Sequence, residues 1–269
     1  MGACRLWAVA VSAWLVGCAA PASSEAGRRL DAALRAQPVV LLGEVHDHAA
    51  GHRLRAEALD RWLASGARPA LVMEMFDRER QGDLDRALAQ PGATADTLIA
   101  AAGGGGWNWA LYKPLLELAL RHRLPIVAAN VSRNDARRVM REGLPALGLS
   151  ADVPPDVEAA HVESMVAGHC GQIDATSARP MARAQAARDQ VMATLLEQHA
   201  ARGAVLIAGD GHVRTDVGVP RWLDAATRAR SVAVGLVEGG DAPFDVRIVL
   251  PAQERRDPCA DMPARSSRP

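Results

Sequence analysis

Short apolar runs alternate with longer amphipathic segments along most of this chain. Residues 39–42 form an apolar, partly β-branched run, and residues 49–65 after it place Leu54, Ala58 and Trp62 on one helical face. Repeated alternation of this kind is typical of an α/β fold, in which a mostly parallel central sheet is flanked by helices. We expect the further strands at residues 70–75, 126–129, 205–208, 231–237 and 244–250.

The remaining pattern predicts helices between these strands. Residues 132–200 are mainly helical in pattern, and we expect them to form a lobe covering the C-terminal edge of the strands. The last two predicted strands flank a Glu-Gly-Gly-Asp turn, which favours a hairpin. We therefore predict one domain over residues 28–253, followed by an irregular tail at 254–269. The other helices are expected at residues 27–36, 77–89, 93–102 and 107–121.

The first residues have the pattern of an export signal. Arg5 precedes an apolar run, residues 6–17, that is too short to span a bilayer, which takes roughly 20 apolar residues. The run ends in Leu-Val-Gly-Cys, which resembles the lipobox of bacterial lipoproteins. This resemblance implies a signal peptide at 1–17, a lipidated Cys18 and a tether over 18–27. The alternative is an ordinary signal peptide cleaved near Ala20. Ala19 favours anchoring to the outer membrane, facing the periplasm, by resemblance to lipoprotein sorting rules.

Charge and cysteine content narrow the function classes. Lys+Arg and Asp+Glu are both 31, so the chain has no net charge and no electrostatic basis for binding nucleic acid. Beyond the leader only Cys170 and Cys259 remain, and an even pair in an oxidising compartment predicts a disulfide. The alternative is that Cys170, beside His169, is a metal ligand or a reactive thiol.

Polar side chains follow three of the predicted strands. Glu44 and His46 come after the first, Glu74 lies at the end of the second, and His212 follows the strand at 205–208. The carboxyl ends of parallel strands are where α/β proteins place their chemistry, so we expect these four side chains to meet at one edge of the sheet. For the nearby His48 and His52 we expect a structural role, with one of them exposed and Asp47 capping the next helix.

Longer motifs extend this pattern. Besides Leu-Leu-Gly-Glu-Val-His-Asp at 41–47, the chain has Trp-Asn-Trp-Ala-Leu-Tyr-Lys-Pro at 107–114, His-Cys-Gly at 169–171, an Ala-Gln-Ala-Ala-Arg-Asp-Gln helix from 184 and Gly-His-Val-Arg-Thr-Asp-Val-Gly-Val-Pro at 211–220. In these motifs the sequence resembles the ChaN-like haem-binding uptake proteins of the Tiki superfamily. The resemblance implies haem binding, between two copies of the chain as a homodimer, in iron acquisition. No Cys-x-x-Cys-His motif is present, so the haem would be bound noncovalently.

Haem requires an axial ligand, an apolar wall and cations for its propionates. Tyr112 is the only tyrosine, and with His46 and His212 it is a candidate iron ligand. The alternative for Tyr112 is a place on a buried helix face, with its hydroxyl hydrogen-bonded. His161, Met165 and His169 share one helical stripe, where each could meet an iron or simply pack. The full set of candidate cofactor-binding residues is Glu44, His46, Glu74, Tyr112, Arg133, His169, Gln185, Arg188, His212 and Arg214.

The polar residues at the strand ends also fit a second class of function. The Tiki superfamily also contains metal-dependent proteases and hydrolases of the erythromycin-esterase type. In that interpretation Glu44, His46, Glu74 and His212 would hold a divalent metal or activate water. A third interpretation is a scaffold lipoprotein whose polar cluster has no activity. The sequence contains no His-Glu-x-x-His motif, which counts against a metalloprotease of that type.

Overall fold

The computed structural model describes residues 24–260. The predicted signal peptide, Cys18 and most of the tether lie outside this range, so they stay predictions. Within residues 24–260 no helix combines the length and the apolar character needed to cross a membrane.

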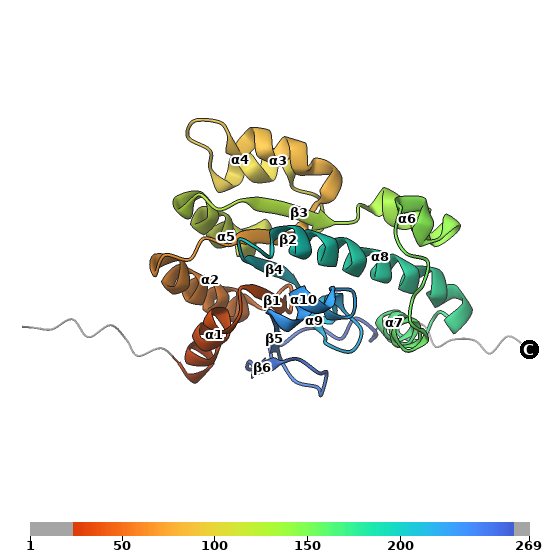
Figure 1. Cartoon of the computed structure of the whole chain (residues 1–269). Helices are drawn as coiled ribbons and strands as arrows, with labels where there is room; N and C mark the ends of the chain where they lie inside the picture. Colours follow the sequence, from red (N-terminus) through yellow and green to blue (C-terminus); the bar gives the residue numbers. More distant parts are fainter. Residues whose placement is uncertain (1–23, 261–269) are drawn as a thin grey trace, which may run out of the picture.

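A six-stranded sheet forms the centre of the molecule, in the order β3-β2-β4-β1-β5-β6 (Figure 1). All of its strand pairs are parallel, which confirms the predicted α/β class. Every residue of β1, β4 and β5 is buried, as expected for inner strands covered on both faces. The strands are β1 (Val39–Glu44), β2 (Ala70–Asp77), β3 (Ile126–Asn130), β4 (Ala204–Gly209), β5 (Ser231–Val237) and β6 (Val246–Val249).

The predicted hairpin of the last two strands is wrong. β5 and β6 run parallel, with Val234 opposite Val246 and Val237 opposite Val249. The connecting segment runs back along β5 because two residues fix it there. The carboxylate of Asp245 accepts a hydrogen bond from the backbone N–H of Ala233 at 2.8 Å, and the side chain of Phe244 packs on Gly235. The Gly-Gly pair therefore begins a return loop instead of a two-strand turn.

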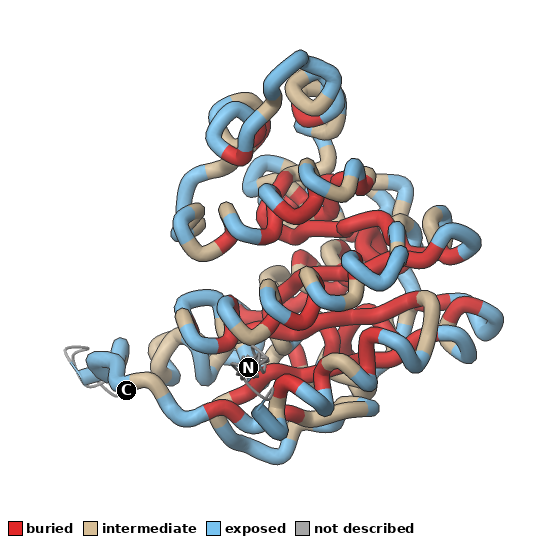
Figure 2. The backbone as a smooth tube through the Cα atoms, turned by 90° about the vertical axis from the view of Figure 1, so that its left-hand side faces the viewer, coloured by how far each residue is buried: buried red, intermediate tan, exposed pale blue. Residues whose placement is uncertain are grey.

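Helices cover both faces of the sheet. On one face α1, α2, α4 and α5 pack over a large apolar core, and on the other the C-terminal half of α8 packs over a smaller one. Figure 2 shows the buried residues concentrated on the strands and on the inner sides of these helices. The helices are α1 (Glu25–Ala36), α2 (Ala49–Ala64), α3 (Gln81–Leu88), α4 (Ala95–Ala102), α5 (Trp109–His122), α6 (Arg133–Glu142), α7 (Pro155–Gly168), α8 (Ala175–His199), α9 (Asp210–Val213) and α10 (Ala225–Ala229).

Four predicted helix starts are wrong. α1 begins at Glu25 instead of residue 27, and α4 begins at Ala95 instead of residue 93. The helix expected from Asp77 begins at Gln81, because Asp77 ends β2 and a 3₁₀ turn, Arg78–Arg80, follows it. The helix expected from Trp107 begins at Trp109. The later start of α3 lengthens the segment between the end of β2 and this helix, and the later start of α5 lengthens the loop after α4.

Helices α6, α7 and the N-terminal half of α8 extend beyond the sheet (Figure 1). α6 and the middle of α8 share a separate apolar cluster, which includes Val139, Ala187 and Val191 together with Val131 before α6. α7 packs on α8, and its end is joined to the C-terminal segment by the disulfide Cys170–Cys259, with Cα atoms 5.6 Å apart. This is the predicted disulfide, so Cys170 is neither a free thiol nor a metal ligand.

Candidate functional site

The four polar residues predicted at the strand ends lie close together. Glu44 is the last residue of β1, Glu74 lies in β2, and His212 lies in α9, directly after β4. Because β4 pairs with both β1 and β2, the carboxyl ends of these three strands converge. Glu74 links them, since its Oε2 accepts a hydrogen bond from the backbone N–H of Gly209 at 2.8 Å and its Oε1 lies 3.6 Å from Nε2 of His212.

His46 is the most accessible member of this group. Its Nδ1 lies 2.9 Å from Oε1 of Glu44, and its side chain is 44% exposed. A carboxylate can only accept a hydrogen bond, so this contact assigns the ring proton to Nδ1 and leaves the lone pair on Nε2. The ring stands edge-on to Trp107, with centroids 5.0 Å apart. A Cβ atom at Gly209 would come within 2.9 Å of Nε2, so a glycine is needed for this close approach.

A buried network fixes Glu44 from behind. The guanidinium of Arg55, on α2, is fully buried and forms an ion pair with Oε2 of Glu44. Tyr112, also fully buried, donates its hydroxyl hydrogen to Oε1 of Glu44. Burial raises the pKa of Tyr112 above its usual value and lowers that of Arg55 to about 10, so at neutral pH the phenol is protonated and the guanidinium charged.

His52 completes the network by linking Arg55 to the loop of His46. Nη2 of Arg55 donates to Nδ1 of His52 at 2.8 Å, and Nε2 of His52 donates to the backbone carbonyl of His46 at 2.9 Å. Burial lowers the pKa of His52, which favours the neutral ring that this arrangement requires. Glu44 and His46 are thus held through both their side chains and their backbone.

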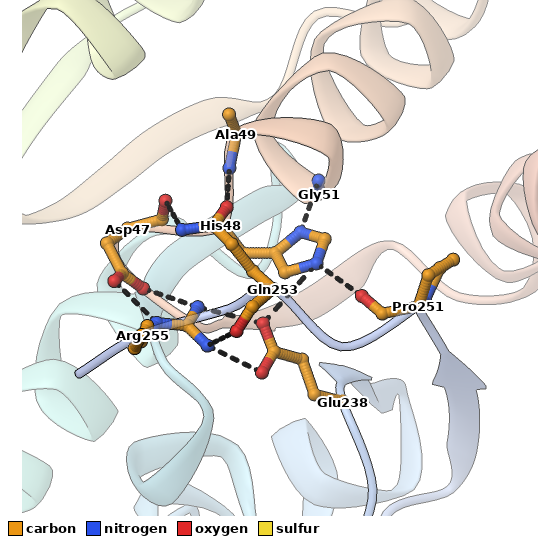
Figure 3. A network of polar contacts seen from close by, with 8 residues as sticks. All are labelled: Asp47, His48, Ala49, Gly51, Glu238, Pro251, Gln253 and Arg255. Atoms are coloured by element: carbon orange, nitrogen blue, oxygen red, sulfur yellow. Dashed lines mark hydrogen bonds and ion pairs between the residues drawn. The ribbon is translucent and has the colours of Figure 1, made fainter. Parts of the chain in front are cut away.

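The expectation for His48 and Asp47 was wrong in detail. Both His48 and His52 are buried, and the helix cap is His48, whose Nδ1 accepts a hydrogen bond from the backbone N–H of Gly51 at 2.9 Å. Asp47 instead binds Arg255 of the C-terminal segment through two oxygens, at 2.6 and 2.7 Å (Figure 3). These hydrogen bonds from Arg255 lower the pKa of Asp47. The sequence could not show this partner, which lies more than 200 positions away.

A second buried network surrounds His212. Its Nδ1 lies 2.6 Å from Oδ1 of Asp189, a fully buried carboxylate on α8, and Nε2 of His161 lies 3.5 Å from Oδ2 of the same residue. Burial lowers the pKa of His212, but the charges of Asp189 and Glu74 and the hydrogen bond to Asp189 outweigh burial and raise it to about 9. Asp189 belongs to the Ala-Gln-Ala-Ala-Arg-Asp-Gln motif singled out in the sequence, with Gln185 and Arg188, but the sequence assigned it no role of its own. The available signal was an acidic residue among the alanines of this helix.

An open cavity of about 1070 Å³ lies between these strand ends and helices α6, α7 and α8. Its walls combine one imidazole, three thioethers, the Gly104–Gly106 loop with Trp107, and three arginines. Of the residues singled out in the sequence, His46, Arg133, Met165, Gln185 and Arg188 line it. Sequence reasoning missed Arg137, Met140 and Met181, although Arg133, Arg137 and Met140 follow the i, i+4, i+7 spacing of one helical face.

The arginines of this cavity differ in their partners. Arg188 is part-buried and donates from Nε to Oδ1 of Asn130 at 3.1 Å; burial lowers its pKa. Arg133 and Arg137 are exposed on α6, and neither has an ion pair or hydrogen bond within residues 24–260. Two guanidinium groups are therefore free to bind an anionic group of a ligand.

The other predicted residues lie away from this cavity. Tyr112 lies behind Glu44, as in the structural alternative for this residue. His212 and Arg214 line a neighbouring cavity of about 90 Å³ that shares Met165 and Gln185 with the large one. Arg214 forms an ion pair with Asp216, and its hydrogen bonds to that carboxylate raise the pKa of Arg214. His169 ends α7, where its Nδ1 donates to the carbonyl of Met165 at 2.7 Å.

Comparison with known proteins identifies the family. The model of the family described as "Haem-binding uptake, Tiki superfamily, ChaN" matches residues 30–223, which is most of the chain. The chain belongs to the ChaN family. No protein with a curated description matches it.

One solved structure agrees with this assignment at the level of the fold. The chain is similar to the structure described as "Cofacial heme binding to ChaN of Campylobacter jejuni", with a TM-score of 0.66 and 22% identity over 79% of this chain and 86% of that one. The type III effector HopBA1 matches with a TM-score of 0.43 and 13% identity, over 79% and 88% of the two chains. The α/β architecture of this chain is thus the ChaN fold.

The metal-dependent hydrolase that the sequence left open has no support. Within residues 24–260 no group of three or more His, Cys, Asp or Glu side chains is arranged to hold a metal ion. Glu44 and Asp189 are instead neutralised by Arg55 and His212 inside the protein.

Proposed function

We propose that this ChaN-family protein binds haem noncovalently in the large cavity. The observation that supports this proposal most directly is the composition of the cavity walls. An accessible imidazole, three methionines and two unpaired arginines line the same cavity. Membership of a haem-binding family supports the same ligand. A cavity of about 1070 Å³ lies at the upper end of the usual range for cofactor sites, as a planar tetrapyrrole requires.

The donor atoms of the cavity fit haem. Imidazole and thioether groups are both axial ligands of haem iron in proteins. Among the three predicted ligands, His46 is the one that lines the cavity, and its hydrogen bond to Glu44 fixes the orientation of the ring. Met140, Met165 and Met181 offer a thioether or an adaptable apolar wall. We therefore propose His46 as the iron ligand, in preference to Tyr112.

Arg133 and Arg137 are the residues that would bind the propionates. They are one turn apart on α6, exposed and unpaired, and a guanidinium binds a carboxylate through two parallel hydrogen bonds. When bound, the haem would supply an iron centre capable of binding ligands and of redox chemistry. The protein would fix the orientation of the haem and limit the access of water to it. Cys170 and Cys259 are joined in a disulfide, so neither can form a thioether bond to haem.

We also propose a place and a task for the protein. A lipid on Cys18 would hold it at the cell envelope, at the outer membrane facing the periplasm, where it would take part in haem or iron uptake. The open side of the cavity would let two copies of the chain bring their haems together. The support for this dimer is the cofacial arrangement named for the ChaN structure of Campylobacter jejuni.

A hemin titration of the full-length chain in detergent tests this function. We expect a saturable Soret shift near one hemin per chain and a mass increase to a dimer on size-exclusion chromatography. In His46→Ala the Soret position should change because the ligand is lost, whereas Tyr112→Phe should retain the wild-type spectrum. If the spectrum follows Tyr112 instead, the ligand assignment is wrong. If hemin does not saturate at all, the proposed function is wrong.

A further inference from the structure

The C-terminal segment Pro251–Cys259 connects the loop that follows His46 to the end of α7. At its start it binds the loop directly after His46, and at its end it is bonded to the helical lobe. The segment has no regular secondary structure. We refer to Pro251–Cys259 as the strap.

Five side chains fix the first half of the strap (Figure 3). Arg255 binds Asp47 through two hydrogen bonds, at 2.6 and 2.7 Å, and Glu238 through two more, at 2.7 and 2.8 Å. Nε2 of His48 contacts the carbonyl of Pro251 at 2.9 Å. The side chain of Gln253 bonds the backbone of the same loop on both sides, at Asp47 and Ala49. The strap is thus fastened to the loop that carries His46.

The disulfide fixes the other end of the strap. Cys170 directly follows α7 and its end residue His169, and it adopts a left-handed backbone conformation with φ of +54°. Cβ-bearing residues disfavour this region, so the conformation needs surrounding contacts to hold it. Both cysteines are partly exposed, so a reductant can reach the sulfur atoms.

The two fixed points are close in sequence. Cys259 lies four positions after Arg255, and such a segment spans at most about 14 Å. α7 carries Met165 of the cavity wall and packs on α8, which carries Met181, Gln185 and Arg188. Outward movement of the end of α7 would therefore pull on Arg255 and on the loop of His46.

We propose that the strap is a redox-sensitive tie that holds the helical lobe against the sheet and so slows the loss of ligand from the cavity. A dithiol reductant opens it. One thiolate attacks a sulfur of the Cys170–Cys259 bond to give a mixed disulfide, and the second thiol of the reductant then displaces the protein sulfur. Two electrons and two protons pass to the cysteines, and the reductant becomes a cyclic disulfide. The part of this inference that concerns ligand retention rests on the proposed haem binding.

Hydrogen exchange on the haem-free, full-length chain tests the tie without any ligand. We expect faster amide exchange over residues 155–185 when dithiothreitol is added to the wild type, but no further change when it is added to Cys259→Ser. Arg255→Gln, which keeps the disulfide, should give faster exchange at residues 45–50. Exchange that is the same in oxidised and reduced wild type, and in both variants, would overturn the proposal.

Ligand retention is measured separately, by transfer of hemin to excess apomyoglobin. Variants replace the reductant here, because a thiol also reacts with haem iron. We expect hemin to leave Cys259→Ser and Arg255→Gln about tenfold faster than the oxidised wild type, equivalent to ~1.4 kcal/mol. Equal rates in all three proteins would contradict the retention role even if exchange responds. If no hemin binds, the proposed function fails, and the exchange result alone decides whether the tie exists.

Discussion

At the scale of single residues, Arg55 is the group on which the site depends most. It is a fully buried cation that neutralises Glu44 and orders His52, and both partners act directly on His46. The sequence predicted Glu44 and His46, because charged residues directly after an apolar strand are visible as a pattern. It could not predict Arg55. An arginine on an amphipathic helix is usually solvent-facing, and only the packing of α2 against the sheet turns this one inward.

Arg55→Met should be strongly destabilising. Removing one partner of a buried ion pair leaves the carboxylate of Glu44 uncompensated, which costs about 3–5 kcal/mol in the free energy of unfolding. Arg53→Met is the matched control, since Arg53 is exposed on the same helix and should change stability by less than about 0.5 kcal/mol. Urea unfolding followed by circular dichroism measures both. If both variants change the free energy of unfolding by the same small amount, Arg55 does not neutralise a buried charge.

His212 should make stability depend on pH. Its pKa is raised to about 9 in the folded protein, against about 6.5 unfolded, so its contribution is fully present below pH 6.5 and is lost as pH rises through 9. We expect His212→Gln to remove about 2–3 kcal/mol of stability at pH 6 and much less at pH 9.5. Unfolding free energies of both proteins across this range provide the measurement. A constant difference between them would mean that His212 is neutral in the fold.

At the scale of elements, the parallel pairing of the strands explains why the polar residues predicted at the strand ends lie close together. β4 lies between β1 and β2, so residues far apart in sequence end at the same edge. The same order could not be deduced from sequence, since it depends on which strands pair. The prediction of a β5–β6 hairpin was wrong for a related reason. The turn signal was correct, but Asp245 and Phe244 direct the chain back along β5.

Close packing between β1 and α9 gives a test of this arrangement. A Cβ at Gly43 would lie 2.2 Å from Cγ2 of Val213 and 2.9 Å from the Cα of Asp210, so Gly43→Ala should destabilise by about 1–3 kcal/mol. Gly211→Ala is the control, because nothing lies within 4 Å of its Cβ position on α9; it should be neutral or stabilising by up to ~1 kcal/mol. Thermal unfolding compares the two. A larger loss of stability in Gly211→Ala than in Gly43→Ala would contradict this packing of α9 against β1.

At the scale of the whole molecule, the cavity belongs to neither the sheet nor the lobe alone. His46 comes from a strand end, Arg133 and Arg137 from α6, and the methionines from three different helices. The sequence indicated the sheet side of this site, where strand ends carry polar residues, and named Arg133, Gln185 and Arg188 of the lobe side. The lobe side depends on how α6, α7 and α8 pack, and the spacing of Arg133, Arg137 and Met140 becomes informative only once that packing is known.

The central claim is that haem occupies this cavity with its propionates on α6. The most direct test compares hemin with its dimethyl ester, which has no free carboxylates, in the wild type and in the double variant Arg133→Gln/Arg137→Gln. We predict that esterification weakens binding to the wild type by about tenfold or more, as for the loss of charge-assisted hydrogen bonds, and has little effect in the double variant. Arg138→Gln, on the same helix but paired with Glu142, should behave as the wild type. An equal loss on esterification in all three proteins would contradict the account.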